Sequence, residues 1–305
     1  MTEGLLFAIA SALSFGVSDM FAALVSRRLG AIAAAAGILL ISFLSLVVIA
    51  VALRPTFPDS WSWAVPVALL GVLTGFAYLS LVNALRLGPV SVVGPLGATG
   101  GAIVVVLAVV LLGNRPAPLE WTAVVVTTAG AVLVALVRAP GERPRLNGPG
   151  PLFALAAVGG YAFSVIGLQG PIREVGWLQT LVVWRAANVI VASTVFVATR
   201  RQRTAAGPAA ALPSGDVVVA TPALSRWRLA LPVALLLAGL LESAGQTLRA
   251  FALDVAPAWL VGVANPLGPI VVVTAGVLLF GERLRPPQVL GMVMVGVGLV
   301  LLSIA

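Results

Sequence analysis

The sequence predicts an all-α integral membrane protein of ten transmembrane helices, arranged as two inverted-topology five-helix repeats. Three observations predict this fold class: a strongly apolar composition, long apolar runs separated by short polar breaks, and a second half that repeats the first. The composition excludes a soluble protein, the runs give the number of helices, and the repeat gives their topology.

The composition is far more apolar than that of a soluble protein. Hydrophobic residues make up 60% of the 305 residues and charged residues only 9%, whereas an ordinary globular domain has about 25% charged residues. The chain has no Cys and no His, so it has no thiol nucleophile, no disulfide, no zinc site of the usual kind and no imidazole base. Its net charge of +8 comes from 18 Arg against 10 acidic residues, and most of the Arg lie in the gaps between apolar runs, which suits anionic lipid headgroups better than nucleic acid.

Ten apolar runs are long enough to cross a bilayer, which takes about 20 residues of helix. Breaks rich in charge, Pro or Gly separate the runs, as turn residues do. The longest break, 200–228, is rich in Ala, Pro, Gly and Ser and is predicted to be a flexible loop. No cleaved signal peptide is expected, because an acidic residue and no basic one precedes the first run. The predicted spans are 4–25, 31–53, 62–85, 90–112, 120–137, 151–169, 177–199, 229–250, 258–280 and 288–305.

The two halves of the chain repeat each other at two offsets. Residues 84–134 align with 252–302 at an offset of 168 without a gap, and residues 4–30 align with 150–176 at an offset of 146. The offsets differ by 22, roughly the excess length of the polar segment. The predicted domains are therefore a five-helix repeat over 1–140 and a second one over 149–305, with a polar insertion near 200–228. Because five is odd, the second repeat is inverted in the membrane.

Inverted repeats are typical of secondary transporters, in which one half rocks against the other around a midplane site. A chance alignment of sequence rich in Ala, Val, Leu and Gly is the alternative interpretation. The gapless match of two charged bends, LLGNRPAPLE at 111–120 and LFGERLRPPQ at 279–288, argues against chance. The repeat therefore favours a transporter.

The segment 269–302 resembles the end of an EamA-type carrier of the drug/metabolite transporter superfamily. An apolar helix ends in Gly-Glu-Arg-Leu, a short turn with Pro follows, and a Gly-rich helix closes the chain. The first-half copy has Asn114 in place of Glu282, and aromatic–small pairs begin at Phe15 and Tyr161, where the family often places them. The resemblance covers essentially the whole chain and implies a ten-helix carrier with cytoplasmic termini. It implies no functional residues, because the family has no shared catalytic signature.

Three charged residues lie inside predicted spans, where a charge costs about 3 kcal/mol and marks a functional candidate. Asp19 lies in the first span, Arg185 in the seventh and Glu242 in the eighth. Glu242 shares a helix face with Gln246 and with Arg249, which lies near the predicted helix end. Glu242 is either a proton-coupling carboxylate or half of a structural ion pair with Arg185. Arg185 is a candidate for binding a carboxylate or phosphate, or for neutralising an acidic residue, and Asp19 for a site, capping or snorkelling role.

Aromatic residues and broken helices add further candidates. Tyr78, Tyr161 and Trp184 are candidates for an aromatic wall that faces a cation or a ring, with interfacial anchoring as the alternative. The string NPLGP at 265–269 interrupts the ninth span and GPLG at 94–97 the fourth; such breaks line transporter sites or act as packing kinks. The candidate substrate-binding or coupling residues are Asp19, Arg185, Glu242, Gln246, Trp184, Tyr78, Tyr161 and Asn265, with no catalytic or metal-ligating residue.

The pattern favours a secondary carrier that exports a small organic metabolite such as an amino acid, with protons as the candidate coupling ion. An exporter of lipophilic cations and a subunit of a lipid-linked-sugar flippase are the alternatives. An enzyme is not expected, because no nucleophile–base pair or metal cluster is apparent, and a Walker motif would need a Lys that the chain lacks. Expected partners are membrane lipids, the small-molecule substrate, protons and a second copy in a homodimer, without nucleic acid or cofactor. The expected location is the cytoplasmic membrane, crossed several times.

The distribution of arginine predicts an orientation. Thirteen arginines assigned to loops lie on the side away from the termini, and four lie on the terminal side, namely Arg54, Arg115, Arg173 and Arg249. By the positive-inside rule, both termini face outward. The family resemblance implies the opposite orientation.

Overall fold

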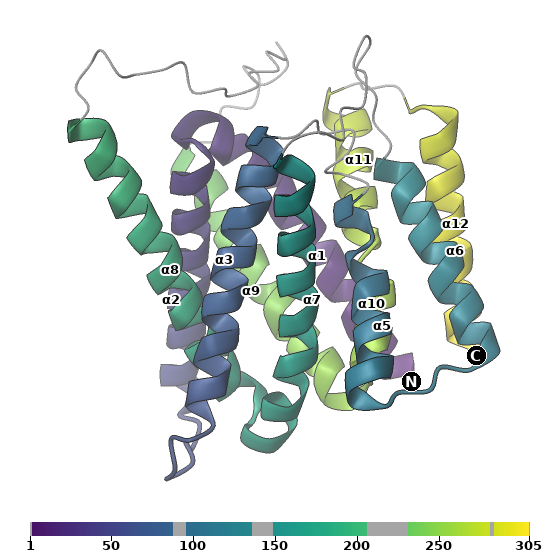
Figure 1. The fold of residues 1–305 in the computed structure, drawn as a ribbon, viewed down its shortest axis with the longest axis horizontal. Coiled ribbons are helices and arrows are strands. Elements are labelled where there is room, and N and C mark those ends of the chain that lie inside the picture. Colours follow the sequence, from purple (N-terminus) through teal and green to yellow (C-terminus); the bar gives the residue numbers. More distant parts are fainter. Residues whose placement is uncertain (1, 88–95, 136–148, 206–230, 281–283, 305) are drawn as a thin grey trace.

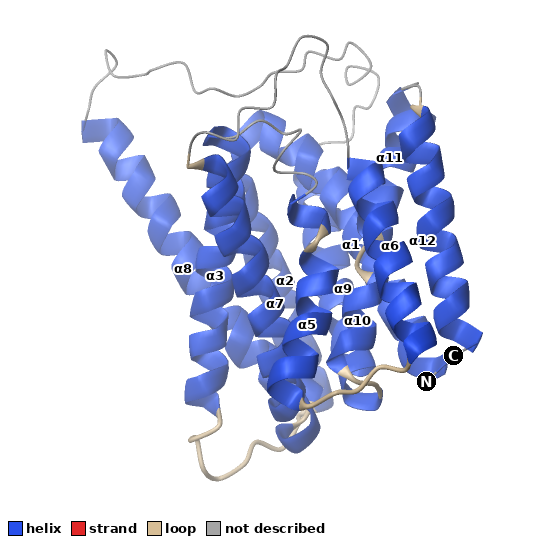
Figure 2. Ribbon diagram, turned by 45° about the vertical axis from the view of Figure 1, so that its right-hand side comes forward, coloured by secondary structure: helices blue, strands red, loops and turns tan. Residues whose placement is uncertain are grey.

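The computed structural model describes residues 2–87, 96–135, 149–205, 231–280 and 284–304, and its regular structure there is entirely helical (Figure 2). The helices stand side by side, and both termini lie at the same end of the molecule (Figure 1). The helices are α1 (Thr2–Leu29), α2 (Ala31–Leu53), α3 (Ala64–Leu87), α5 (Gly100–Leu112), α6 (Pro118–Ala135), α7 (Gly150–Val175), α8 (Trp177–Ala205), α9 (Leu231–Val255), α10 (Ala258–Ala264), α11 (Leu267–Phe280) and α12 (Pro286–Ile304).

Eight helices within the described ranges are long and apolar enough to cross a membrane. Two shorter apolar stretches, Leu96–Leu112 and Ala258–Val271, fall where the fourth and ninth spans are predicted. The prediction of a helical membrane protein is therefore confirmed, whereas the long helices do not add up to the predicted ten. The ninth predicted span is divided at NPLGP into α10 and α11, because Pro266 has no N–H to continue the helical hydrogen bonds. Residues 94 and 95 of the GPLG string lie outside the described residues, and residues 96 and 97 begin the apolar helical stretch Leu96–Leu112.

Three helices extend at least five residues beyond their predicted ends. α8 continues to Ala205, so the predicted loop does not begin at 200, and its residues 206–228 lie outside the described part of the chain. α7 runs through Pro171 to Val175, and α9 runs to Val255 rather than ending at 250. A span defined by hydropathy stops at the first polar residues, but Arg, Gln and Glu extend a helix readily.

The helices of the two halves interleave. α1 packs along α9 and α3 along α7, while α2 contacts both α8 and α9, and α6 pairs with α12. α1 runs away from the end that carries the termini, whereas α7 runs towards it (Figure 1). Each helix of one half therefore finds its main partner in the other half.

Contacts between the helices follow the sequence offsets. Gly71 of α3 lies directly against the backbone of Trp184 in α8, and Gly239, 168 positions later, lies against the backbone of Ile38 in α2, 146 positions before Trp184. A side chain at either glycine would collide with the facing helix. Gly71 and Gly75 form a small-xxx-small pattern of the kind that lets membrane helices pack closely.

The short connections between the first two helices of each half also match. Gly30 joins α1 to α2 with φ of 80°, and Gly176 joins α7 to α8 with φ of 114°. These backbone angles are open to glycine and strained for other residues. The two positions are 146 apart, as the alignment of the halves requires.

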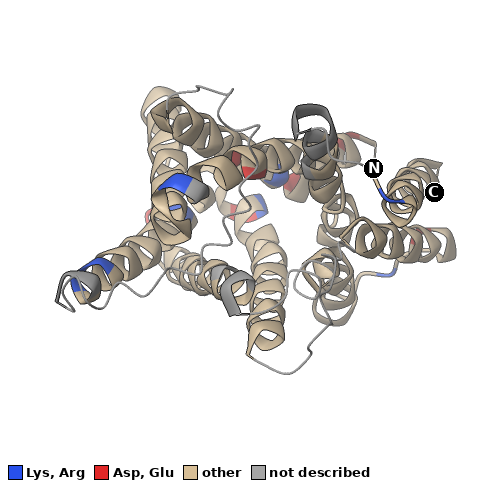
Figure 3. Ribbon diagram, turned by 90° about the horizontal axis from the view of Figure 1, so that it is seen from above, with Lys and Arg blue, Asp and Glu red and all other residues tan. Residues whose placement is uncertain are grey.

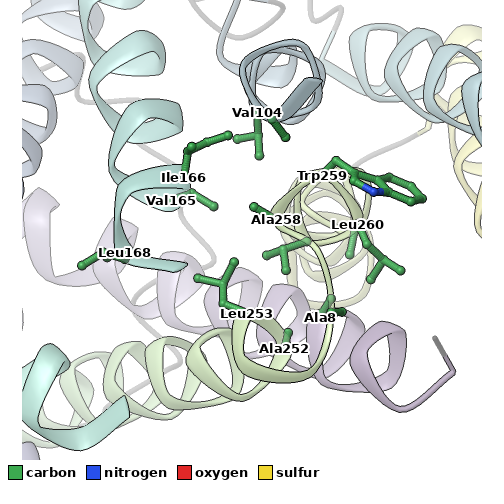
Figure 4. Close-up of a cluster of buried hydrophobic side chains, with 14 of the residues drawn as sticks. Ala8, Val104, Val165, Ile166, Leu168, Ala252, Leu253, Ala258, Trp259 and Leu260 are labelled. Atoms are coloured by element: carbon green, nitrogen blue, oxygen red, sulfur yellow. The ribbon is translucent and has the colours of Figure 1, made fainter. Parts of the chain in front are cut away.

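The largest apolar core lies where α1, α5, α7, α9 and α10 meet, and it includes Ala8, Val104, Leu253 and Trp259 (Figure 4). Large apolar side chains such as Val110 and Val300 are exposed on the outside of the bundle, as the lipid-facing surface of a membrane protein requires. Viewed along the helices, charged residues also occur near the middle of the bundle (Figure 3). These central charges form the candidate site.

Candidate functional site

A buried ion pair joins α8 to α9. Arg185 Nη2 lies 2.9 Å from Glu242 Oε1, and the exposed fraction of the side chain is 1% for Arg185 and 18% for Glu242. Each charge lowers the cost of burying the other. The structure thus contains the ion pair, which was one of the two interpretations of Glu242. The other interpretation, proton coupling, stays a prediction.

Gln246 connects this ion pair to a second arginine on α9. Its Nε2 donates to Glu242 Oε1 at 3.0 Å, and its Oε1 accepts from Arg249 Nη2. Arg249 Nη1 donates in turn to the hydroxyl of Tyr161 on α7 at 2.6 Å. A continuous chain of hydrogen bonds therefore runs from Arg185 through α9 to Tyr161.

Aromatic rings surround the guanidinium group of Arg249. Its Cζ lies 5.6 Å from the ring centre of Phe15, 5.3 Å from that of Tyr161 and 5.7 Å from that of Trp184. The guanidinium of Arg185 lies 4.8 Å from the ring of Trp184. The structure thus brings Tyr161 and Trp184 together as an aromatic wall. The guanidinium groups of Arg185 and Arg249 lie near these rings.

Trp184 is held by hydrogen bonds to both neighbouring helices. Its indole N–H lies 3.2 Å from Thr74 Oγ1 on α3 and 3.3 Å from Ser164 Oγ on α7, and these two hydroxyls are 2.5 Å apart. Because the side chain is 1% exposed, the anchoring of Trp184 at a membrane interface is excluded. Its ring is fixed between the two arginines.

Asp19 faces the interior of the bundle from α1. Its charge interacts with Glu242, and the hydroxyl of Tyr78 on α3 interacts with Asp19, Glu242 and Arg185. Asp19 is nevertheless exposed, and it forms no ion pair with any described residue. Since α1 continues to Leu29, Asp19 does not cap the helix, and its exposed carboxylate opens onto accessible space inside the bundle.

Asn265 lies apart from this cluster. It follows the end of α10, its N–H donates to the carbonyl of Gly262 at 3.3 Å, and its carbonyl accepts from Gly268 at 3.1 Å. No described contact joins its side chain to the charged cluster. The break between α10 and α11 therefore shapes the backbone there, and a binding role for Asn265 stays a prediction.

Three serines attach α1 to α9 beside the cluster. Ser11, Ser14 and Ser18 donate to carbonyls of α9, each at 2.8 Å. Their spacing of three and four residues places them on one helix face. These bonds fix the face of α1 that carries Phe15 and Asp19.

Sequence reasoning placed Arg249 on the helix face of Glu242 but did not name it as a site residue, and it did not identify Phe15, Thr74 or Ser164 as members of the site. It counted Arg249 as a loop residue on the terminal side, which is wrong, because the side chain is 2% exposed inside α9. The error came from ending the span at 250. The spacing of seven residues from Glu242 was the available signal, since it places both on one face.

A separate pocket of about 340 Å³ lies among α2, α3, α7 and α8, with Ser80, Asn83 and Thr199 as its polar lining. It contains none of the charged residues of the cluster. The candidate site is therefore the cluster, where the charges and aromatic rings converge.

Comparison with solved structures shows the fold to be a known one. A structure described as "Crystal structure of protein" has a TM-score of 0.72 to this chain, covers 97% of this chain and 96% of its own, and shares 16% sequence identity. At that identity, the likeness concerns the fold alone. No curated protein sequence matches the chain.

Comparison with protein families finds two matching segments. The EamA-like transporter family matches residues 2–136 and 148–304. The two segments together span nearly the whole sequence, one in each half. The chain belongs to the EamA-like transporter family, and it is a membrane transporter.

Proposed function

We propose that the protein is a secondary transporter that exports a small organic metabolite, an amino acid or a related compound, across the cytoplasmic membrane. The observation that carries the proposal is the buried chain of polar side chains from Arg185 to Tyr161, in the midst of helices that span the membrane. Ionisable residues at that depth are costly and characteristically line the path of a substrate or ion.

The proposed mechanism is alternating access in a ten-helix arrangement of two inverted repeats. The two family segments and the opposite directions of α1 and α7 support it. The moving units would each contain helices of both halves, because α1 packs on α9 and α3 on α7. This differs from the simple rocking of one sequence half against the other.

Protons are the proposed coupling ion. Asp19 is exposed and the Glu242 side chain is 18% exposed, so both carboxylates are open to exchange with water inside the bundle. The two negative charges also repel each other. Protonation of one carboxylate relieves that repulsion and offers a way to link proton movement to the state of the site.

The export of lipophilic cations is disfavoured by the same geometry. A cation cage needs open aromatic faces, and guanidinium groups already lie over Trp184 and Tyr161. The third candidate, a subunit of a flippase for lipid-linked sugars, differs in moving no soluble substrate.

Counterflow in proteoliposomes tests the proposal. Wild type and Glu242→Gln are compared with a panel of labelled amino acids and organic cations, with and without a pH gradient. We expect saturable exchange of amino acids, from which Glu242→Gln loses only the pH-driven component. Exchange of no solute by folded protein would contradict the proposal and favour lipid-linked cargo.

A further inference from the structure

We propose that Arg249 is the anchor for the transported solute and that it binds a single carboxylate group. This inference rests on the proposed function and names the class of substrate for the same site. It is carried by four features of Arg249: its burial, its lack of a carboxylate partner, its aromatic surroundings and its position relative to Asp19.

Arg249 is the buried cation that remains without a counter-charge. Its side chain is 2% exposed, and it forms no ion pair in the part of the chain that the structure describes. Arg185, the other buried arginine, is already paired with Glu242. Since burying a charge without a partner of opposite sign is costly, Arg249 is the group in this cluster that an anionic ligand would stabilise most.

The described hydrogen bonds of Arg249 leave some of its donors available to such a ligand. A guanidinium group has five N–H donors, and the described partners of Arg249, Gln246 and Tyr161, each accept one bond from a different terminal nitrogen. Both partners are neutral acceptors. The remaining donors lie in the plane of the group, which is the geometry that recognises a carboxylate through two parallel bonds.

The rings around Arg249 select against a cationic ligand. Phe15, Tyr161 and Trp184 lie within 5.7 Å of the guanidinium carbon, so the attraction that these rings offer to a cation is already used by Arg249. A cationic solute would also meet the positive charge of the arginine. The cluster therefore suits a solute with an anionic end.

Asp19 limits the solute to one negative group. It lies one turn beyond Phe15 on α1, is exposed within the bundle and forms no ion pair among the described residues. A second carboxylate on the solute would be repelled by Asp19, whereas an ammonium group would be attracted. The proposed substrate class is therefore the monocarboxylic amino acids, with the carboxylate on Arg249.

The test measures binding, so it does not depend on transport. The full chain in lipid nanodiscs is heated with L-leucine, L-phenylalanine or L-threonine, with the matching amide of each, or with succinate. We expect an amino acid to raise the unfolding temperature, and its amide and succinate to need at least a tenfold higher concentration for the same rise. An equal response to acid and amide, or no response to any amino acid, overturns the proposal.

Variants separate a binding role from a structural one. We expect Arg249→Gln to abolish the preference for acid over amide, and Arg249→Lys to retain it with weaker binding, because Lys keeps the charge without the planar fork. If Arg249→Gln does not fold, Tyr161→Phe removes only the hydroxyl that positions Nη1, and the preference should fall severalfold. The proposal is overturned if Arg249→Gln still prefers the acid to the amide. If Arg249→Gln does not fold, the same result in Tyr161→Phe overturns it.

Arg173→Gln is the matched control. Arg173 donates to carbonyls of Leu253, Asp254 and Ala256 at the end of α9, outside the cluster, and so also links α7 to α9. Its replacement should lower stability and leave the acid–amide preference unchanged. A preference lost equally in Arg173→Gln would show a general effect of loosening the two helices and overturn the assignment to Arg249.

The two proposals fail in different ways. If wild type exchanges solutes in counterflow but does not prefer acids to amides, the proposal of secondary transport stands and the proposal that Arg249 is the anchor is overturned. If wild type binds amino acids through Arg249 but exchanges none of them, the proposal that Arg249 is the anchor stands and secondary transport is contradicted.

Discussion

Glu242 uses one carboxylate oxygen for two hydrogen bonds. Oε1 accepts from both Arg185 and Gln246, while Oε2 has no described partner. In the other half of the chain the equivalent positions of Arg185 and Glu242 are Leu39 and Thr74. The first half therefore has two uncharged residues at the positions where the second half has the ion pair.

This pairing predicts a non-additive effect on stability. Glu242→Thr leaves the buried Arg185 without its partner and should cost about 2–4 kcal/mol of unfolding free energy, somewhat below the range for a fully buried pair because Glu242 is 18% exposed. The double variant Arg185→Leu with Glu242→Thr copies the other half and should recover most of the loss. Chemical unfolding of the purified variants measures both effects, and simple addition of the two single losses would contradict the prediction.

Hydropathy and spacing were sufficient for part of the site and not for the rest. A charge inside an apolar run is conspicuous, so Asp19, Arg185 and Glu242 were found, and the ion pair was named as one option. Phe15 was not found, because its position over Arg249 depends on how α1 is rotated against α9. That rotation is set by Ser11, Ser14 and Ser18, whose acceptors are carbonyls more than 200 positions away in the sequence.

At the scale of helices, close packing depends on small residues. Gly71 of α3 faces the carbonyl of Trp184, whereas Gly159 of α7 has open space where a Cβ would be placed. We expect Gly71→Ala to cost about 1–3 kcal/mol of unfolding free energy, because overpacking forces the backbones apart. Gly159→Ala is the control and should leave stability nearly unchanged, and equal losses in the two variants would argue against this packing contact.

The hydrogen bonds between α1 and α9 predict a loss of stability when the serines are removed. Replacing Ser11, Ser14 and Ser18 together by Ala should cost about 2 kcal/mol, since a hydrogen bond between membrane helices contributes about 0.6 kcal/mol on average. Ser26→Ala is the control, because Ser26 donates only to the nearby carbonyl of Ala23 in its own helix. Thermal unfolding in nanodiscs measures the difference, and a triple variant as stable as Ser26→Ala would contradict the role of the serines.

At the scale of the whole molecule, the repeat of the spans along the chain was accessible from the sequence, but their packing against one another and their extent were not. The repeat offsets reappear as packed glycine contacts and as matched turns at Gly30 and Gly176. The interleaving of α1 with α9 and of α3 with α7 left no mark in the hydropathy pattern, because lipid and protein interior are equally apolar. Hydropathy also did not predict the helix ends that lie beyond the apolar runs, because polar residues can continue a helix outside the membrane.

The orientation of the whole molecule is open to a direct measurement. Removing Arg249 from the loop count strengthens the excess of arginine on the side away from the termini, so the positive-inside rule predicts outward-facing termini. The chain contains no Cys, so Ser60→Cys in the exposed loop between α2 and α3, and Arg28→Cys near the end of α1, each carry a single thiol. An impermeant maleimide on intact cells should label Ser60→Cys and spare Arg28→Cys.

The opposite labelling would give the cytoplasmic termini that the family resemblance implies. Labelling of both thiols from one side would contradict the passage of α2 across the membrane.

The pairing of α1 with α9 also has a consequence in time. The serine at 11 and its acceptor at Gly245 are 234 positions apart. At a synthesis rate of about 5–20 residues per second, α1 is made roughly 10–50 s before its partner. During that interval its serines can bond to carbonyls of their own helix, and Asp19 lacks the nearby Glu242 of α9. The order of synthesis thus leaves α1 without its main partner helix until α9 is made.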